Sequence, residues 1–146
     1  MASRVQEIAT DTAPCLTTAA IPAFSVLAAD GSNAGNVKLC PAYTQSGTLL
    51  KLVGVSTELS SIGGNVKYCY LGQVRCVSDG TAVINPYDIV IPSATVAGSV
   101  MTYALAGGAD TNLCSVVGQC VDMAQIPATA GAIVTVRLML EHTITG

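Results

Sequence analysis

Short runs of alternating residues, each closed by a turn signal, recur along this chain. The clearest is Val66–Val77, whose even positions carry Val, Tyr, Gly or Cys, while the odd positions include Lys67, Gln73 and Arg75. Successive side chains of a strand point to opposite faces, so this run predicts a strand with a mostly apolar inward face and a mixed outward face. No stretch of eleven or more residues keeps the spacing of an amphipathic helix without interruption.

Other runs have the same character and are separated by Gly, Asn, Asp or Pro turns. In the last run Val134, Val136, Leu138 and Leu140 lie on one face, whereas Thr135 and Arg137 lie on the opposite face. A chain of eight or so such strands is expected to be all-β, as a small β-sandwich or barrel-like domain with an extended N-terminal arm. The predicted strands are Val37–Cys40, Leu49–Val55, Val66–Val77, Ile89–Ile91, Val100–Leu105, Cys114–Val121 and Ala132–Leu140.

Three glycines interrupt these runs after a pair of large residues. They are Gly54, Gly72 and Gly118. Glycine inside a strand often marks a bulge or a sharp bend, so we expect curvature at these points rather than a sequence repeat.

No low-complexity linker divides the chain, which predicts one β domain over residues 23–146. Residues 1–22 differ from the rest: they alternate only weakly, at Val5 and Ile8, and then run through several Thr and Pro residues. Two interpretations stay open for this segment. It is either an extended arm or an ordinary edge strand followed by a loop.

Charged side chains are scarce. The chain has six Lys and Arg and nine Asp and Glu among 146 residues, so that 10% is charged and 51% is hydrophobic, whereas about one quarter of a typical soluble domain is charged. No apolar run approaches the roughly eighteen residues of a membrane span. We therefore expect no membrane partner and a surface largely covered by other protein. The net charge of −3 also argues against direct nucleic-acid binding.

The six cysteines have two interpretations. Residues 1–8 lack the apolar segment of a secretory signal, which predicts synthesis in the cytosol and reduced, buried cysteines. A disulfide framework is the alternative, since the number of cysteines is even. Their spacing is wider than the tight pairs of zinc sites, so no metal is expected. The cysteines are Cys15, Cys40, Cys69, Cys76, Cys114 and Cys120.

The sequence offers little for catalysis. His142 is the only histidine and lies near the C-terminus, where a positioned partner and an enclosed pocket are not indicated. The residues Asp79, Asp88, Asp110 and Asp122 occur singly, mostly beside turn residues. We expect no catalytic residue and no cofactor, so the protein is not expected to be an enzyme.

One region carries a family resemblance. Pro86–Val100, which contains Pro-Tyr-Asp-Ile-Val-Ile-Pro-Ser, is followed by Val116–Val121 and by the closing run Ala130–Leu138. This order resembles the capsid cement, or head decoration, proteins of tailed bacteriophages, in which a Gly-Asp-x-Val-x-Pro-Ser turn precedes a strand and a Val-x-Val-x-Leu strand closes the chain. The resemblance covers roughly residues 24–140, and Tyr87 stands where Gly is commoner.

The resemblance implies a non-enzymatic structural protein on the virion exterior, made in the host cytoplasm. It would stabilise the capsid by bridging major capsid protein subunits, as a homo-oligomer, with a trimer favoured over a dimer. An N-terminal arm would add a strand to a capsid sheet edge. The expected capsid contacts are Arg4, Val5, Gln6, Glu7 and Ile8.

Two alternatives are kept. The first is a β-sandwich binding module, carbohydrate-binding or adhesive, on a virion or cell surface, in which Tyr68 and Tyr70 offer a stacking platform. The second is a small enzyme that uses a cysteine together with His142.

Overall fold

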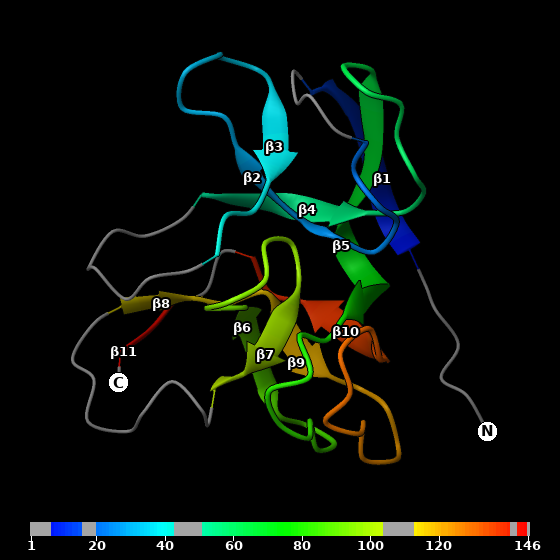
Figure 1. The fold of residues 1–146 in the computed structure, drawn as a ribbon, viewed down its shortest axis with the longest axis vertical. Helices are drawn as coiled ribbons and strands as arrows, with labels where there is room; N and C mark the ends of the chain where they lie inside the picture. The colour runs from blue at the N-terminus through cyan, green and yellow to red at the C-terminus, as the bar shows by residue number, and fades with distance from the viewer. Residues whose placement is uncertain (1–6, 16–19, 43–50, 104–112, 141–142, 146) are drawn as a thin grey trace.

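The computed structural model describes residues 7–15, 20–42, 51–103, 113–140 and 143–145. Within these residues the chain is all-β, as the sequence predicts. Eleven strands form one continuous nine-stranded antiparallel sheet and a separate two-stranded sheet (Figure 1). In the described part of the chain, no helix has the length and apolar character needed to cross a bilayer.

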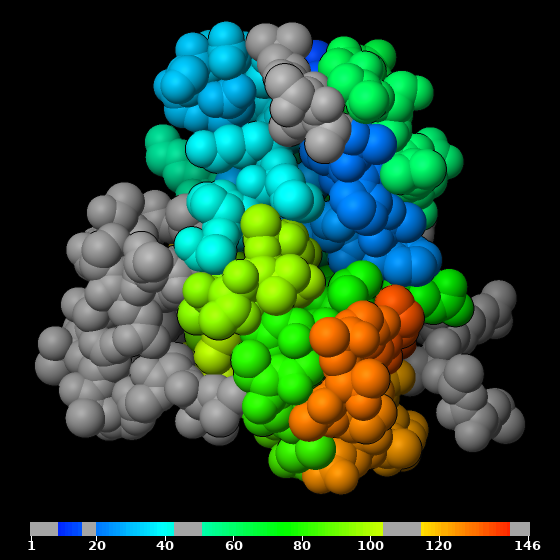
Figure 2. Space-filling model, in the orientation of Figure 1, coloured from blue at the N-terminus to red at the C-terminus, as the bar shows by residue number. Residues whose placement is uncertain are grey.

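The large sheet has two halves that share one long strand. The N-terminal half has the order β3-β2-β4-β5-β1, and the C-terminal half has the order β5-β10-β9-β6-β7. In the space-filling view, the blue and cyan residues of the N-terminal half lie above the orange residues of the C-terminal half (Figure 2).

The strands are short except for the shared one. Those of the N-terminal half are β1 (Glu7–Pro14), β2 (Val26–Ala29), β3 (Val37–Leu39), β4 (Leu52–Ser56) and the start of β5 (Asn65–Val77). The C-terminal half adds β6 (Ile89–Pro92), β7 (Val100–Thr102), β9 (Gly118–Cys120) and β10 (Ile133–Leu138). The two-stranded sheet pairs β8 (Leu113–Ser115) with β11 (Thr143–Thr145).

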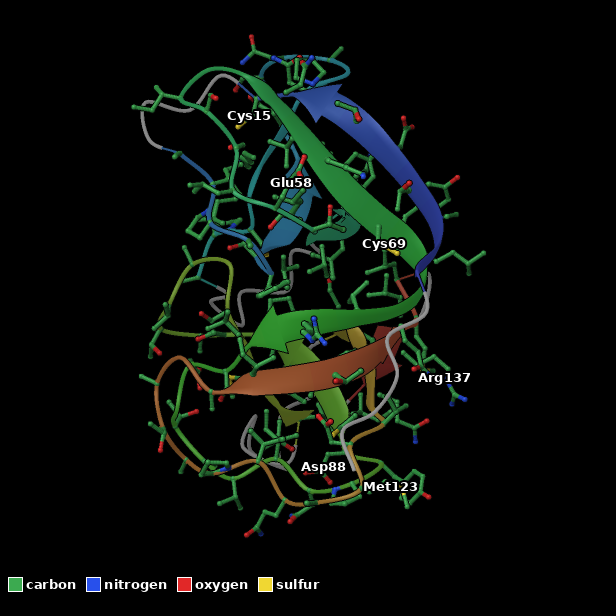
Figure 3. All side chains as sticks on the ribbon, turned by 90° about the vertical axis from the view of Figure 1, so that its right-hand side faces the viewer. Cys15, Glu58, Cys69, Asp88, Met123 and Arg137 are labelled. Atoms are coloured by element: carbon green, nitrogen blue, oxygen red, sulfur yellow. The ribbon has the colours of Figure 1, made fainter. Side chains whose placement is uncertain are left out.

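Strand β5 bends close to Cys69 (Figure 3). The φ of Gly72 is 109°, a conformation that side chains with a Cβ rarely adopt. The pairing of β5 with β1 is also irregular here, opposite Leu71 and Gly72. Before the bend β5 lies between β1 and β4, and after it β5 pairs with β10. The bend that Gly72 predicts is therefore confirmed, and it allows one strand to belong to both halves.

The bend changes which positions of β5 face the main core. Val66 and Tyr68 pack in a small cluster on one face of the N-terminal half, whereas Cys69 packs in the large cluster between the halves. After the bend, the even-numbered Val74 and Cys76 join the large cluster. The predicted alternation of β5 is therefore correct within each segment, but its inward face switches at the bend.

The large cluster joins the two halves. Val26 and Val55 enter it from the N-terminal half, and Val90, Val134 and Val136 enter it from the C-terminal half. All five side chains are fully buried. Burial of one such side chain stabilises the fold by about 1.5–3 kcal/mol. Small β-branched residues thus build much of this core.

The C-terminal half curls until its edge strand β7 meets the end of β5. The backbone N–H of Asp79 donates to the carbonyl oxygen of Val100 at 3.0 Å. The buried Asp79 carboxylate then accepts hydrogen bonds from Ser93 Oγ at 2.5 Å and from the Thr81 backbone N–H at 2.9 Å. Because Ser93 directly follows β6, this carboxylate ties the end of β5 to the end of β6.

The predicted strands are mostly present, with four differences. β1, β2 and β11 form where no strand run was predicted, although residues 1–22 had an edge strand as one interpretation. The predicted strand Cys114–Val121 is divided into β8 and β9, because the chain passes there from one sheet to the other.

Replacing Gly118 with Ala should destabilise the protein. An added Cβ would clash with the carbonyl oxygen of Arg137 and lie 2.6 Å from Val136 Cγ1, because β9 and β10 approach closely at this point. We expect the free energy of unfolding to fall by about 3 kcal/mol, the upper end of the usual range for overpacking. Chemical denaturation measures the difference. Gly31→Ala is the control, since nothing lies within 4 Å of its added Cβ, and equal stability of the two variants would contradict the close approach.

Ser93→Ala should also destabilise the fold. Ser93 Oγ donates to the buried Asp79 carboxylate and accepts from the backbone N–H groups of Thr95 and Val96. A buried polar group without a hydrogen-bond partner costs about 1–3 kcal/mol. We expect the free energy of unfolding, measured by thermal or chemical denaturation, to fall by that amount. The exposed Ser32→Ala is the control and should change stability by less than about 0.5 kcal/mol. A neutral Ser93→Ala would show that the tie between β5 and β6 contributes nothing.

Candidate interaction surface

Three of the described aspartates connect strands and turns through hydrogen bonds. Asp79 ties two strand ends, as described above. Asp88 Oδ2 accepts from the Asn85 backbone N–H at 2.9 Å and from Thr102 Oγ1 at 3.2 Å. Asp122 Oδ2 accepts from the Thr135 backbone N–H at 2.7 Å. Among the residues that the structure describes, no three His, Cys, Asp or Glu side chains are grouped to hold a metal ion. His142 lies outside the described residues.

Cysteine chemistry is suppressed by burial. Five of the cysteines, all but Cys114, have described side chains, and all five are buried. Burial raises the pKa of the Cys40 thiol to about 12, and nearby Lys38 only partly offsets it. Burial also raises the pKa of Cys76 and of Cys120. The thiolate is the reactive form, so these three thiols are poor nucleophiles near neutral pH.

The turn Asn85–Asp88 places an aromatic side chain in a strained backbone conformation. The N–H of Asp88 donates to the carbonyl oxygen of Asn85 at 3.1 Å, which closes a four-residue turn with Pro86 at its second position. Tyr87, at the third position, has a φ of 68°. This is the geometry of a type II turn, in which Gly or Asn normally occupies that position.

Hydrogen bonds on both sides hold this strained residue. The N–H of Tyr87 donates to the carbonyl oxygen of Cys120 at 3.0 Å, and Gln119 Nε2 donates to the carbonyl oxygen of Tyr87 at 3.1 Å. Gln119 is itself positioned by Arg137, whose Nη2 donates to Gln119 Oε1 at 2.6 Å. A left-handed non-glycine residue costs of order 1–2 kcal/mol and persists only when its surroundings determine it. The Tyr87 ring is nevertheless 70% exposed, so packing within the chain does not explain its presence.

Tyr87 belongs to one of two segments without charged residues, which together we call the charge-free end and which Asp79, Asp88 and Asp122 adjoin along the chain. It consists of residues 80–87 and 123–133, and none of these residues is charged. The bridge between Ile84 and Ile126 joins the two segments. Figure 3 shows Met123 at this end of the molecule, near Asp88. Met123 is 80% exposed, and Val83 and Ile133 are also exposed.

The predicted capsid contacts are only partly described. Arg4, Val5 and Gln6 lie outside the described residues. Glu7 and Ile8 begin strand β1, where Glu7 is aligned with Gly72 of β5. The described chain pairs β1 with β5 alone, which places β1 at an edge of the N-terminal half.

The two tyrosines of β5 differ in exposure. The Tyr68 side chain is 8% exposed and packs in the small cluster, whereas Tyr70 is 46% exposed. Their ring centroids are 6.3 Å apart and the rings are inclined at 55°. They do not form a flat two-ring platform, because only Tyr70 presents a substantial surface.

The sequence contained a signal for the charge-free end that the pattern analysis missed. Two separate uncharged segments adjoin predicted turns, and Pro86-Tyr87 places an aromatic residue at a turn position that favours glycine. The bridge between Ile84 and Ile126 and the hydrogen bond from Gln125 Nε2 to Asn85 Oδ1 show that these segments share one surface.

Searches for relatives of this chain returned no matching protein-family model and no matching curated protein.

Thiol titration tests the state of the cysteines. The denatured, unreduced protein should react with six equivalents of a thiol reagent, whereas Cys40, Cys76 and Cys120 should react slowly in the folded protein at pH 8. The pKa of these thiols is higher in the folded protein than the value near 9.0 expected for the unfolded chain. As the pH rises above 9.0, the unfolded chain therefore loses these protons first, and the free energy of unfolding falls.

The two outcomes that would contradict this are distinct. Clearly fewer than six reactive thiols in denaturant would indicate disulfides. Rapid reaction of all thiols in the folded protein would contradict their burial.

Proposed function

We propose that this protein is a non-enzymatic structural protein that decorates the exterior of a viral capsid and stabilises it by bridging major capsid protein subunits. It acts as a homo-oligomer, with a trimer favoured over a dimer. The single observation that carries the proposal is the exposed, strained Tyr87 in the charge-free end, together with the resemblance of Pro86–Val100 to phage cement proteins.

Strain at Tyr87 supports a role for its side chain. Glycine would relieve the backbone strain at this turn position, and the exposed ring gains little packing within the chain. Tyrosine is enriched among the residues that dominate binding energy at protein interfaces. The cores of interfaces are also depleted in charge, as the charge-free end is. A partner protein that covers Tyr87 and Met123 would bury the exposed tyrosine ring and would contact a surface with few charges.

The motif that carries the resemblance has a structural explanation in this chain. Tyr87 takes the positive φ that glycine favours, Asp88 caps the turn, and Ser93 binds the buried Asp79. Short motifs of this kind therefore position a turn at the end of a curled sheet. The turn residue is what differs here, since a large aromatic side chain replaces hydrogen.

Edge strand β1 supports a second kind of contact. Its outer side is not paired within the described chain, so a partner strand has room to add there. Residues Glu7 and Ile8 belong to this strand and are among the expected contacts. Multiple weak contacts of this kind give strong retention when several copies bind neighbouring subunits of one shell.

The carbohydrate-binding alternative has less support. It relied on Tyr68 and Tyr70 as a stacking platform, and only Tyr70 exposes much of its ring. Loss of glycan binding on Tyr70→Ala would favour that alternative over the capsid role.

The proposal is tested with Met123→Asp, with its matched control Leu59→Asp, and with Tyr87→Gly. The wild-type protein should be oligomeric in light scattering and should sediment with emptied, undecorated tailed-phage heads. Met123→Asp should lower the affinity for the phage heads about tenfold or more, because it places a charge in the contact area. Leu59→Asp is the control, since Leu59 is 68% exposed in the loop between β4 and β5, outside the charge-free end.

Tyr87→Gly separates stability from binding. It should raise the free energy of unfolding by about 1 kcal/mol, because the strain is relieved, while it weakens association with the shell. A wild-type protein that stays monomeric and binds no shell contradicts the proposal. So do equal effects of Met123→Asp and Leu59→Asp.

A further inference from the structure

A pocket of about 330 Å³ opens beside the bend of β5, away from the charge-free end. It is formed where β1, β4 and β5 meet the residues that follow β10. The residues that line it are Asp11, Leu52, Val53, Tyr68, Tyr70 and Leu140. Tyr68 belongs to the small cluster, with Val53 packed against it, and Leu52 and Leu140 pack against the large cluster, whereas Asp11 and Tyr70 are exposed.

The register of β1 and β5 places the polar groups together. Asp11 is aligned with Tyr68 across the antiparallel pair, so their side chains lie on the same face. Tyr70 follows two residues later on that face, with its ring inclined to that of Tyr68. Burial raises the pKa of Tyr68, and the charge of Asp11 raises it further, which is consistent with a carboxylate close to the phenol.

The walls have the chemistry of a site for a cation on an aliphatic stem. Leu52, Val53 and Leu140 supply apolar surface, and Asp11 is the only charged residue among those described as lining the pocket. Aromatic rings attract ammonium and guanidinium groups through their π faces. The methylene stems of Lys and Arg pack on apolar surface while their charged ends reach polar groups.

Other ligands fit less well. An anion would meet the Asp11 carboxylate with no cationic side chain among the described lining residues. A neutral sugar would need a broad aromatic platform, and Tyr68 is almost fully buried. A side chain carried by a protein gains further contacts around the pocket, whereas a small free amine does not.

We propose that this pocket binds a Lys or Arg side chain presented by a partner protein. The net charge of −3 favours approach of a basic protein surface. This inference concerns a site separate from the charge-free end and does not depend on the capsid role.

Nuclear magnetic resonance titration of the full chain tests it, with blocked single amino acids as probes. N-acetyl-lysine methylamide and N-acetyl-arginine methylamide should shift the signals of Asp11, Tyr68 and Tyr70 in a saturable way. One isolated side chain should bind with a dissociation constant on the order of 10 mM. N-acetyl-norleucine methylamide has a similar stem without the charge and should bind at least fivefold more weakly. Lactose is the sugar probe and should cause no saturable shift.

Matched variants assign the effect to the pocket. Asp11→Asn should weaken binding of the lysine probe at least fivefold. Glu58→Gln also removes one negative charge, but outside the pocket, and its dissociation constant for the lysine probe should stay within twofold of the wild-type value. Tyr70→Phe should retain binding and Tyr70→Leu should weaken it about threefold or more, because the π face is lost. The wild-type amide spectrum serves as the check that each variant is folded.

Four results would overturn the proposal. These are the absence of saturable shifts with both cationic probes, equal binding of the norleucine probe, binding of lactose at the same residues, and equal effects of Asp11→Asn and Glu58→Gln. Lactose binding would identify a sugar site instead. None of these results bears on Met123 or Tyr87, so the capsid role is tested separately.

Discussion

The bend of β5 is the constraint on which the rest of the structure depends. A single strand pairs with β1 and β4 on one side of Gly72 and with β10 on the other, and this continuity joins the two halves of the sheet. The change of direction brings Cys69 and Val74 into the same cluster, although a straight strand would place them on opposite faces. The core that unites the halves therefore exists because one residue without a Cβ permits the turn. Tyr70, two residues before the bend, is exposed and lines the pocket together with Asp11.

Much of the fold was predictable because most strands keep one face toward a core. β5 and β10 were placed by their alternation, and Gly72 was predicted as a bend. β2 was not predicted, because Val26–Ala29 packs on both faces and so shows no alternation. β1 was not recognised as a strand run, because its Thr and Asp residues are exposed at a sheet edge. A local sequence pattern reveals a strand when one face is buried and the other is exposed. Neither β1 nor β2 has this contrast between an apolar face and a polar face.

The candidate surfaces were much less predictable than the strands. At the turn Asn85–Asp88, a tyrosine with positive φ opposes the local preference and is held by Gln119 and Cys120, which lie more than thirty residues away. The pocket depends in the same way on the register of β1 and β5, which aligns Asp11 with Tyr68. Both surfaces arise from pairings between distant segments. No run of neighbouring residues contains enough information to specify them.

The two surfaces differ in a way that matters for recognition. The charge-free end offers exposed apolar area around Met123 and Tyr87, and such area supplies binding energy with little selectivity among apolar partners. The pocket offers one carboxylate and the exposed ring of Tyr70, which would select the charge and shape of a single side chain. A partner that presents a basic residue to the Asp11 pocket and an apolar patch to Tyr87 would satisfy both, and the spacing of these two features on the partner would then determine which protein binds.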